Sequence, residues 1–124
     1  MLIERTDLQL RREPFTRPFG FKGSQFHEKW TPVARLTAAD GTSALGVGGL
    51  APLWSDHRVF AAHDETGANV LQMSVLENAL TLIAGREFRD PIALHDALFG
   101  PAHEFARKAT GLSDLRPTFT LVAL

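Results

Sequence analysis

A turn signal at Asp40-Gly41 constrains the fold of this chain more than any other feature of its sequence. A glycine after an aspartate supplies the positive φ angle that tight hairpin turns need, and this pair lies between two runs of apolar and small residues. We therefore expect antiparallel strands over Thr31–Ala38 and Thr42–Gly48. Alternation along the first of them predicts one apolar face, formed by Ala34, Leu36 and Ala38.

A further strand is expected over Leu2–Arg12, where apolar and polar residues alternate and Pro14 follows. The three strands would form a meander. Two long segments, Pro14–Lys29 and Gly49–Gly67, have neither a helical nor a strand period, and we predict loops there, with a short helix in part of the second. Long loops in compact domains are often functional. Gly46, Gly48 and Gly49 predict a bulge, a sharp exit or a place where another backbone or a ligand comes close; the alternative is only a flexible end of the hairpin.

The C-terminal half predicts helices. From Asn69 onward, apolar residues recur every three or four positions, and Gly85 is placed to end that helix. Asp90-Pro91 predicts the start of a second helix, which Gly100-Pro101 is expected to break before a third helix that ends near Thr110. The apolar stripe of the first helix consists of Val70, Leu71, Met73, Leu76, Leu80 and Ile83.

The expected fold class is α+β: a three-stranded antiparallel β-meander followed by a bundle of three to four helices, as one domain over residues 1–124. The apolar run from Phe119 to Leu124 closes the chain without a charged tail. We interpret this run as the beginning of a helix that is cut off. The alternative is a segment that docks on its own domain.

The composition excludes several function classes. A net charge of −1 with scattered lysines and arginines gives no reason to expect a nucleic acid or an anionic membrane as partner. The absence of cysteine excludes a disulfide framework and fits a cytoplasmic protein. We find no signal peptide pattern, and no apolar stretch long enough to span a bilayer.

Taken together, the motifs resemble the N-terminal capping domain of the enolase superfamily, in its mandelate racemase and muconate lactonizing enzyme branch. The resemblance covers nearly the whole chain and depends on the order and spacing of its parts. The matching residues are Asp40-Gly41, Leu45-Gly46-Val47-Gly48, Ala79-Leu80, Leu82-Ile83, Gly85-Arg86, Asp90-Pro91, Thr110-Gly111 and Phe119–Leu124.

This resemblance implies a substrate-specificity cap that closes over a (β/α) barrel. In that family the barrel binds Mg²⁺ and abstracts a proton α to a carboxylate, as a dehydratase, racemase or epimerase. The barrel carries the metal ligands and the base, so the resemblance implies no catalytic residue and no metal site in this chain, which alone would be inactive. The barrel would lie in cis or in a second chain, and an oligomer is expected.

The resemblance also implies that the two predicted loops meet the substrate. In the first, Arg17 and Lys22 are candidates to contact a small carboxylate substrate, and Phe19 and Phe26 to exclude solvent; Trp54 and Arg58 are candidates in the second. The alternative is that the aromatic residues pack on their own domain and the basic residues are only solvated. One departure is that Leu50 follows Gly48-Gly49, where many relatives have a carboxylate.

Two other functions stay open. One is a free-standing binding or interaction module that kept the cap fold without the barrel. The other is a small metal-dependent hydrolase built on His63-Asp64-Glu65. The sequence disfavours a zinc site, because such sites need three or four converging ligands and the pattern of two histidines one helical turn apart is missing.

Overall fold

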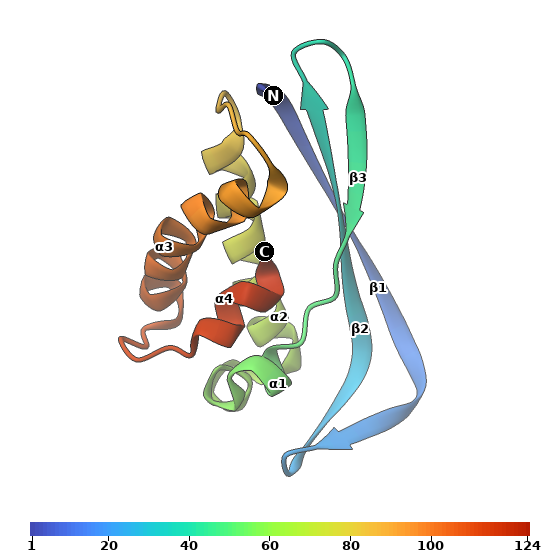
Figure 1. Ribbon diagram of the computed structural model, residues 1–124. Coiled ribbons are helices and arrows are strands. Elements are labelled where there is room, and N and C mark those ends of the chain that lie inside the picture. The colour runs from blue at the N-terminus through green and yellow to red at the C-terminus, as the bar shows by residue number, and fades with distance from the viewer.

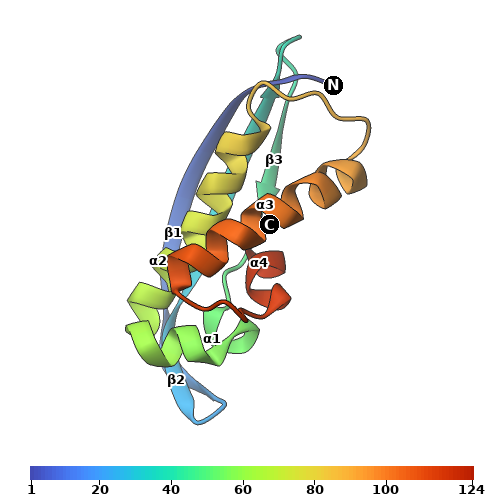
Figure 2. The ribbon, with the colours of Figure 1, turned by 90° about the vertical axis from the view of Figure 1, so that its left-hand side faces the viewer.

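The computed structural model describes residues 1–124 as a three-stranded antiparallel sheet with four helices packed against one of its faces (Figure 1). In the view of Figure 2 the helices lie in front of the sheet. The predicted α+β class, a meander followed by helices, is confirmed. The elements are β1 (Ile3–Phe21), β2 (Ser24–Ala38), β3 (Ser43–Val47), α1 (Pro52–Ser55), α2 (His57–Ile83), α3 (Pro91–Thr110) and α4 (Pro117–Ala123).

The turn at Asp40-Gly41 joins β2 to β3 as predicted. Gly41 has a φ of 88°, and the Asp40 carboxylate accepts a hydrogen bond of 2.9 Å from the Thr42 backbone N–H. The predicted apolar face of β2 is also confirmed, because it packs with β1 against a small cluster in the helices. That cluster consists of the buried Leu80, Ile83 and Leu98, with Leu8, Ala34 and Leu36 packed against it.

The predicted loop over Pro14–Lys29 is wrong, because these residues extend the first hairpin. β1 continues to Phe21, β2 begins at Ser24, and a tight turn at Lys22-Gly23 joins them with both φ angles positive. The pairing is irregular between Pro14 and Phe19, where the register shifts. A register shift interrupts the two-residue alternation, so the strand leaves no periodic signal in the sequence.

In the second predicted loop, Gly49–Gly67, the expected short helix is present as α1, which begins at Pro52. The rest of the loop is wrong from His57 onward, because α2 begins there instead of at Asn69. The helix is kinked at Asp64, whose φ of 59° and ψ of −174° are not helical. The Asp64 carboxylate accepts a hydrogen bond of 2.9 Å from the backbone N–H of Gly67, which caps the helix where it restarts.

The buried face of α2 follows the predicted stripe only in part. Leu80 and Ile83 are buried as predicted, but Val70 is 51% exposed. Beyond the predicted stripe, the residues of α2 that reach the interior are Val59, Phe60, Ala68, Asn69, Gln72, Val75 and Ala79. Small and polar residues occupy much of this face because α1, α3 and α4 pack closely against it. A hydrophobicity pattern cannot mark a face of that composition.

The helix expected to end at Gly100-Pro101 continues through it as α3. Its N-terminus is as predicted, with the Asp90 carboxylate accepting a hydrogen bond of 2.8 Å from the Ala93 backbone N–H. A proline removes one helical hydrogen bond and clashes with the Cβ of the residue before it, but Gly100 has no Cβ. Ala102, which directly follows Pro101, is buried and packs in the hydrophobic core, so it holds the helix in place there.

The larger core lies among the helices at the end of the molecule near α1. It contains ten buried residues, including Leu53, Val59, Phe119 and Ala123. α4 forms a helix as expected, and it packs against α1, α2 and α3. None of the helices combines the length and the hydropathy that crossing a membrane requires.

Candidate functional site

A pocket of about 210 Å³ lies between the turn end of the first hairpin and α1. The hairpin curves under α1 at this point, as Figure 1 shows. Two segments separated in the sequence therefore share one cavity. Its walls are mostly apolar and include Phe19, Phe21 and Phe26 from the hairpin and Pro52, Leu53 and Trp54 from α1.

The hairpin side of the pocket is an aromatic cluster. The ring of Phe26 lies 5.4 Å from that of Phe15 in an edge-to-face arrangement and 5.1 Å from that of Phe19. Both distances fall in the range that stabilises aromatic pairs. Phe19 and Trp54 remain 55% and 53% exposed, so the pocket is open to solvent along its aromatic wall.

Polar contacts fix the hairpin against the helices. The Glu65 carboxylate, just after the kink in α2, accepts hydrogen bonds from the backbone N–H groups of His27 at 2.8 Å and Glu28 at 3.0 Å. At the turn, Lys22 Nζ donates to the backbone oxygen of Trp54 at 3.2 Å. β3 does not extend to this part of β2, so the helix supplies the acceptors that a neighbouring strand would supply elsewhere.

Glu28 lines the pocket, but its charge is matched locally. Its carboxylate accepts hydrogen bonds from Arg12 Nε at 3.1 Å and from Trp30 Nε1 at 2.9 Å. The hydrogen bond from Arg12, followed by that from Trp30, holds the pKa of Glu28 below its ordinary value. The Arg12 guanidinium also lies 4.6 Å from the centre of the Trp30 ring, a cation–π contact.

Lys29 is the charged residue of the pocket without a partner. It forms no ion pair and no hydrogen bond within the chain. Its ammonium group lies beside Gly49, where a Cβ atom would come within 2.7 Å of Nζ. Sequence reasoning missed Lys29 as a site residue: the glycines at the end of β3 predicted a bulge, a sharp exit or the approach of a backbone or a ligand, whereas the group beside Gly49 is a side chain.

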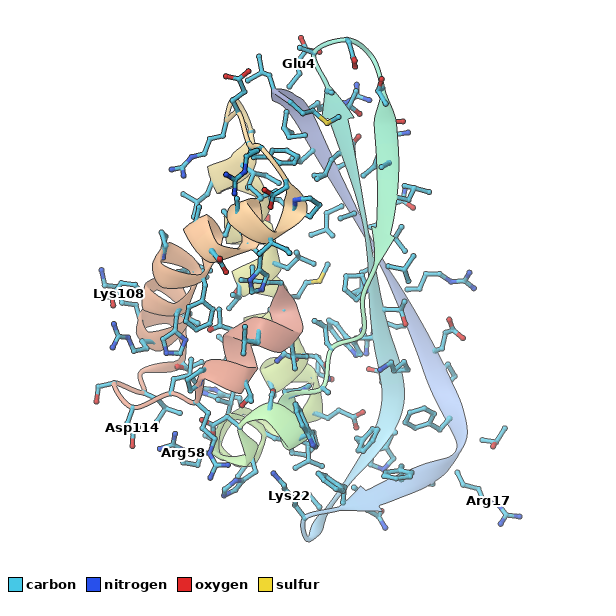
Figure 3. The ribbon with its side chains drawn as sticks, in the orientation of Figure 1. Glu4, Arg17, Lys22, Arg58, Lys108 and Asp114 are labelled. Atoms are coloured by element: carbon cyan, nitrogen blue, oxygen red, sulfur yellow. The ribbon has the colours of Figure 1, made fainter.

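The structure brings some of the predicted site residues together and separates others. Phe19, Phe26 and Trp54 line the pocket, and Lys22 lies at its edge with its ammonium on Trp54. Arg17 points away from the helices, as Figure 3 shows, and does not line the pocket. The contact expected of each residue with a substrate stays a prediction.

Arg58 has a different set of contacts. Its guanidinium donates to Asp56 at 2.8 Å and to Asp114 at 2.9 Å, and Figure 3 places it beside Asp114. The hydrogen bonds that Arg58 donates to the carboxylates of Asp56 and then Asp114 raise the pKa of Arg58. Burial by itself would raise the pKa of Asp56, but the hydrogen bonds from Arg58 and from the Arg116 backbone lower it below its ordinary value.

A buried glutamine positions α1, and sequence reasoning missed it. Gln72 is fully buried; its Oε1 accepts from the Ala51 backbone N–H at 2.9 Å. Its Nε2 donates to Ser55 Oγ and to the backbone oxygen of Phe119, both at 3.0 Å. This side chain thus joins α1, α2 and α4 behind the pocket wall. No sequence signal distinguishes it from an exposed glutamine, because its partners are far away along the chain.

The acidic and histidine residues near the kink do not form a metal centre. No group of three or more His, Cys, Asp or Glu side chains converges anywhere in the chain. Asp64 caps the second part of α2, and Glu65 binds the backbone of β2. Those two contacts give the His63-Asp64-Glu65 segment a structural role.

Comparison with known proteins gives likenesses among solved structures only. No protein-family model matches the chain, and no curated protein does. A mandelate racemase/muconate lactonizing protein from Herpetosiphon aurantiacus is similar over 99% of this chain, with a TM-score of 0.59 and 20% identity. A dipeptide epimerase from Enterococcus faecalis V583, solved with Mg and the dipeptide L-Leu-L-Tyr, is similar over 87% of this chain, with a TM-score of 0.48 and 16% identity.

This chain is much shorter than the proteins it resembles. It covers 30% of the Herpetosiphon protein and 25% of the Enterococcus protein. At such low identity the likeness to the Herpetosiphon structure concerns the fold alone. The resemblance inferred from the sequence is therefore confirmed as a fold shared with part of a mandelate racemase/muconate lactonizing protein.

Proposed function

We propose that this chain is the substrate-specificity cap of an enolase-superfamily enzyme. In this proposal a (β/α) barrel, in the same polypeptide or in a second chain, binds Mg²⁺ and abstracts a proton α to a carboxylate in a dehydration, racemisation or epimerisation. The enzyme is cytoplasmic and oligomeric, and these 124 residues alone are inactive. The observation that carries the proposal is the apolar pocket shared by the first hairpin and the segment after β3.

Those two segments are the ones that the family resemblance assigns to the substrate. One pocket between them supports a role in selecting the apolar part of a small carboxylate substrate and in excluding water from it. The residues of this chain do not fit Mg²⁺, because no three carboxylate or histidine side chains converge. The metal is therefore assigned to the barrel.

In this proposal the cap selects substrates by the shape of its preformed pocket more than by a movement of its loops over the substrate. The first hairpin is a paired strand structure up to the turn at Lys22-Gly23, and Glu65 ties it to α2. Gln72 holds α1 on the opposite wall. Both walls are therefore preorganised, which lowers the conformational entropy that the protein loses when a substrate binds.

The first test is the intact mass of the polypeptide in its own cell, compared with the 13.6 kDa of these residues. A mass several times larger, or a stable partner chain carrying a barrel, is the expected result. A mass of 13.6 kDa without such a partner would overturn the cap proposal and favour a free-standing binding module.

A second test uses the enzyme that contains the barrel. Replacing Trp54 by alanine is expected to change the ratio of kcat/KM values between carboxylate substrates about tenfold, and to leave the affinity for Mg²⁺ unchanged. Val70→Ala is the matched control, since Val70 is similarly exposed but lies outside the pocket. An equal loss of activity on every substrate would contradict a role in selection.

A further inference from the structure

We propose that β3 is a pairing edge for a second copy of this chain. The β3 strands of two copies lie antiparallel about a two-fold axis and join their sheets, and Lys29 of each copy forms an ion pair with Asp40 of the other. This pairing depends on neither the pocket nor a barrel, so it goes beyond the cap proposal.

The two edges of the sheet differ in the residues that they expose. β1, at one edge, contains seven charged residues and two prolines, whereas β3, at the other edge, contains neither. Charges and prolines oppose the addition of a strand to an edge, because a charge resists burial and a proline lacks the N–H that pairing needs. The edge at β1 is therefore protected against pairing, and the edge at β3 is not.

β3 also presents unpaired backbone groups at this edge. Its hydrogen bonds to β2 involve Thr42 just before the strand and Gly48 just after it. In antiparallel sheets, successive residues of a strand point their N–H and C=O groups alternately toward the neighbour on one side and on the other. The even-numbered residues of β3 therefore face β2, whereas Ser43, Leu45 and Val47 point these groups toward the side where no strand lies.

The pattern of β3 suits a second β3 as the added strand. An antiparallel pairing that places Leu45 opposite Leu45 of the second copy also places Ser43 opposite Val47. This register supplies partners for the free N–H and C=O groups of all three residues in both copies. Leu45 and Val47, which are 70% and 71% exposed, would then cover each other across the axis. The new hydrogen bonds and the buried apolar surface both favour association.

Unpaired charges of opposite sign lie beyond the two ends of β3. Asp40 precedes the strand and Lys29 lies beside Gly49 after it, and neither forms an ion pair within the chain. Since Gly49 has no side chain, the Lys29 ammonium lies where a Cβ would come within 2.7 Å of Nζ. The pairing centred on Leu45 brings Gly49 opposite Gly41 of the second copy, next to Asp40. The charges of the two copies are therefore complementary at both ends of the paired strands.

The structure leaves room for this pairing. The chain stays beside β2 after β3, because the Leu50 N–H donates to the Trp30 backbone oxygen at 3.0 Å, so the edge continues as far as Gly49. On the side of the helices, a groove of about 410 Å³ runs along β3, where Ala44 and Gly46 line it. A two-fold axis perpendicular to the sheet keeps the helices of both copies on the same face.

The first test follows the mass of the 124-residue chain, which has its own buried core, by sedimentation at several concentrations. An edge of five residues is smaller than a standard interface, so we expect a weak dimer with a Kd of about 100 μM. The chain should sediment as the 13.6 kDa monomer at about 5 μM and mainly at twice that mass at about 1 mM. A monomer at both concentrations would overturn the inference and leave the cap proposal, which depends on the intact mass, untouched.

Exchange of backbone amides with water, measured by NMR at the same two concentrations, locates the interface. The N–H groups of Ser43, Leu45 and Val47 should exchange several-fold more slowly at the higher concentration, since only the dimer gives them acceptors. Those of Ala44 and Gly46 face β2 in both states and should not depend on concentration. A dimer without this alternation would overturn the pairing of β3 and assign the association to another surface.

Leu45→Lys tests the centre of the pairing. The change places like charges opposite each other at the axis, so the Kd should rise about tenfold or more. Leu45 is exposed, so the monomer should keep its fold, and circular dichroism checks this. Val70→Lys is the matched control, since Val70 is an exposed apolar residue on α2, and its Kd should not change. An unchanged Kd in Leu45→Lys would contradict the pairing.

Neutral variants test the two ion pairs. Asp40→Asn keeps a side-chain oxygen that can accept from the Thr42 N–H, and Lys29→Gln removes the ammonium group. Each should raise the Kd about threefold, since exposed ion pairs are weak and each pair occurs twice. The double variant should bind like either single one, because both changes break the same pairs. Glu77→Gln, on the exposed side of α2, should have no effect. Losses that multiply in the double variant would contradict a direct ion pair.

Discussion

The two ends of the molecule are held together by different kinds of contact. At the pocket end, the larger core surrounds buried polar groups, and Gln72 hydrogen-bonds to α1 and α4. At the sheet end, three buried side chains on α2 and α3 pack against the apolar face of the sheet. The buried polar residues Ser55, Asp56, Asn69, Gln72 and Thr120 all lie outside this region. Directional bonds therefore fix the element that forms the pocket, while nondirectional packing is sufficient to hold the sheet.

The sheet end is also the less closed of the two. A groove of about 410 Å³ runs between the edge of the sheet and helices α2 and α3. On β3, Leu45 is 70% exposed and Val47 is 71% exposed. Loosely packed sites lose less when a side chain is truncated, because part of the surface is already in contact with water. This difference predicts unequal effects of substitutions at the two ends.

The largest effect is expected from Gln72→Ala. The change leaves the Ala51 N–H without its acceptor, removes the donor to Ser55 Oγ and to the Phe119 carbonyl, and creates a cavity, although Ser55 Oγ still donates to the Ala51 carbonyl. A loss of about 4 kcal/mol in the free energy of unfolding follows from these costs. Urea denaturation measures it, with the exposed Gln9→Ala as control, expected within about 0.5 kcal/mol of the unmodified chain. A loss below about 1 kcal/mol would contradict the structural role of Gln72.

Leu98→Ala should have the second largest effect. Leu98 is 8% exposed and belongs to the cluster beneath the sheet. We expect a loss of about 2–3 kcal/mol, at the lower end of the range for buried leucines, since the adjoining groove is already open. The same urea measurement checks this. A loss as large as that of Gln72→Ala would remove the distinction between the two ends.

Two glycine substitutions in the sheet should act in opposite directions. Gly41 has a φ of 88°, so Gly41→Ala strains the turn and should cost about 1 kcal/mol. Gly46 lies in β3 without a positive φ, and a Cβ there meets nothing within 4 Å. Gly46→Ala should therefore stabilise the folded chain by about 0.4–1 kcal/mol, which a slightly higher melting temperature would show. Destabilisation by Gly46→Ala would mean that the edge of β3 needs its flexibility.

The smallest effect is a pH dependence at the pocket end. Burial, and then the nearby Arg107, lower the pKa of His103, whose Nδ1 lies 2.7 Å from Thr120 Oγ1. The folded state thus favours the neutral ring, so its contribution is complete above the ordinary pKa near 6.5 and is lost as the pH falls toward the lowered value.

Unfolding free energies measured at intervals between pH 7 and pH 5 test this contribution. The decrease of the unfolding free energy as the pH falls should be smaller in His103→Gln than in the unmodified chain, because the titrating ring is gone. The exposed His63→Gln serves as control and should keep the slope. A slope that does not change in His103→Gln would assign the pH dependence to another group.

Local chemistry in the sequence determined the elements that depend only on their own neighbours. Asp40-Gly41 predicted the hairpin because a positive φ and an aspartate carboxylate suffice to form that turn. Asp90 predicted the start of α3 for a similar reason, since its carboxylate caps the helix three residues away. Alternation on β2 predicted the face of the sheet that packs against the helices. These signals were sufficient for the fold class.

Only the tertiary structure decided how the site is built. The hairpin over Pro14–Lys29 pairs across a register shift, so it has no period that a sequence can show. α2 extends back to His57 through a kink, and α3 continues through Pro101 because packing compensates for the lost hydrogen bond.

The same holds for the side chains of the site. Lys29, on β2, lies beside Gly49, which follows β3. Gln72 hydrogen-bonds to the backbone oxygen of Phe119, which is 47 positions away in the sequence. Arg17 and Lys29 are equally polar in the sequence, yet only one of them lines the pocket. A residue type fixes what a side chain can bind, whereas the packing of distant segments fixes what lies within its reach.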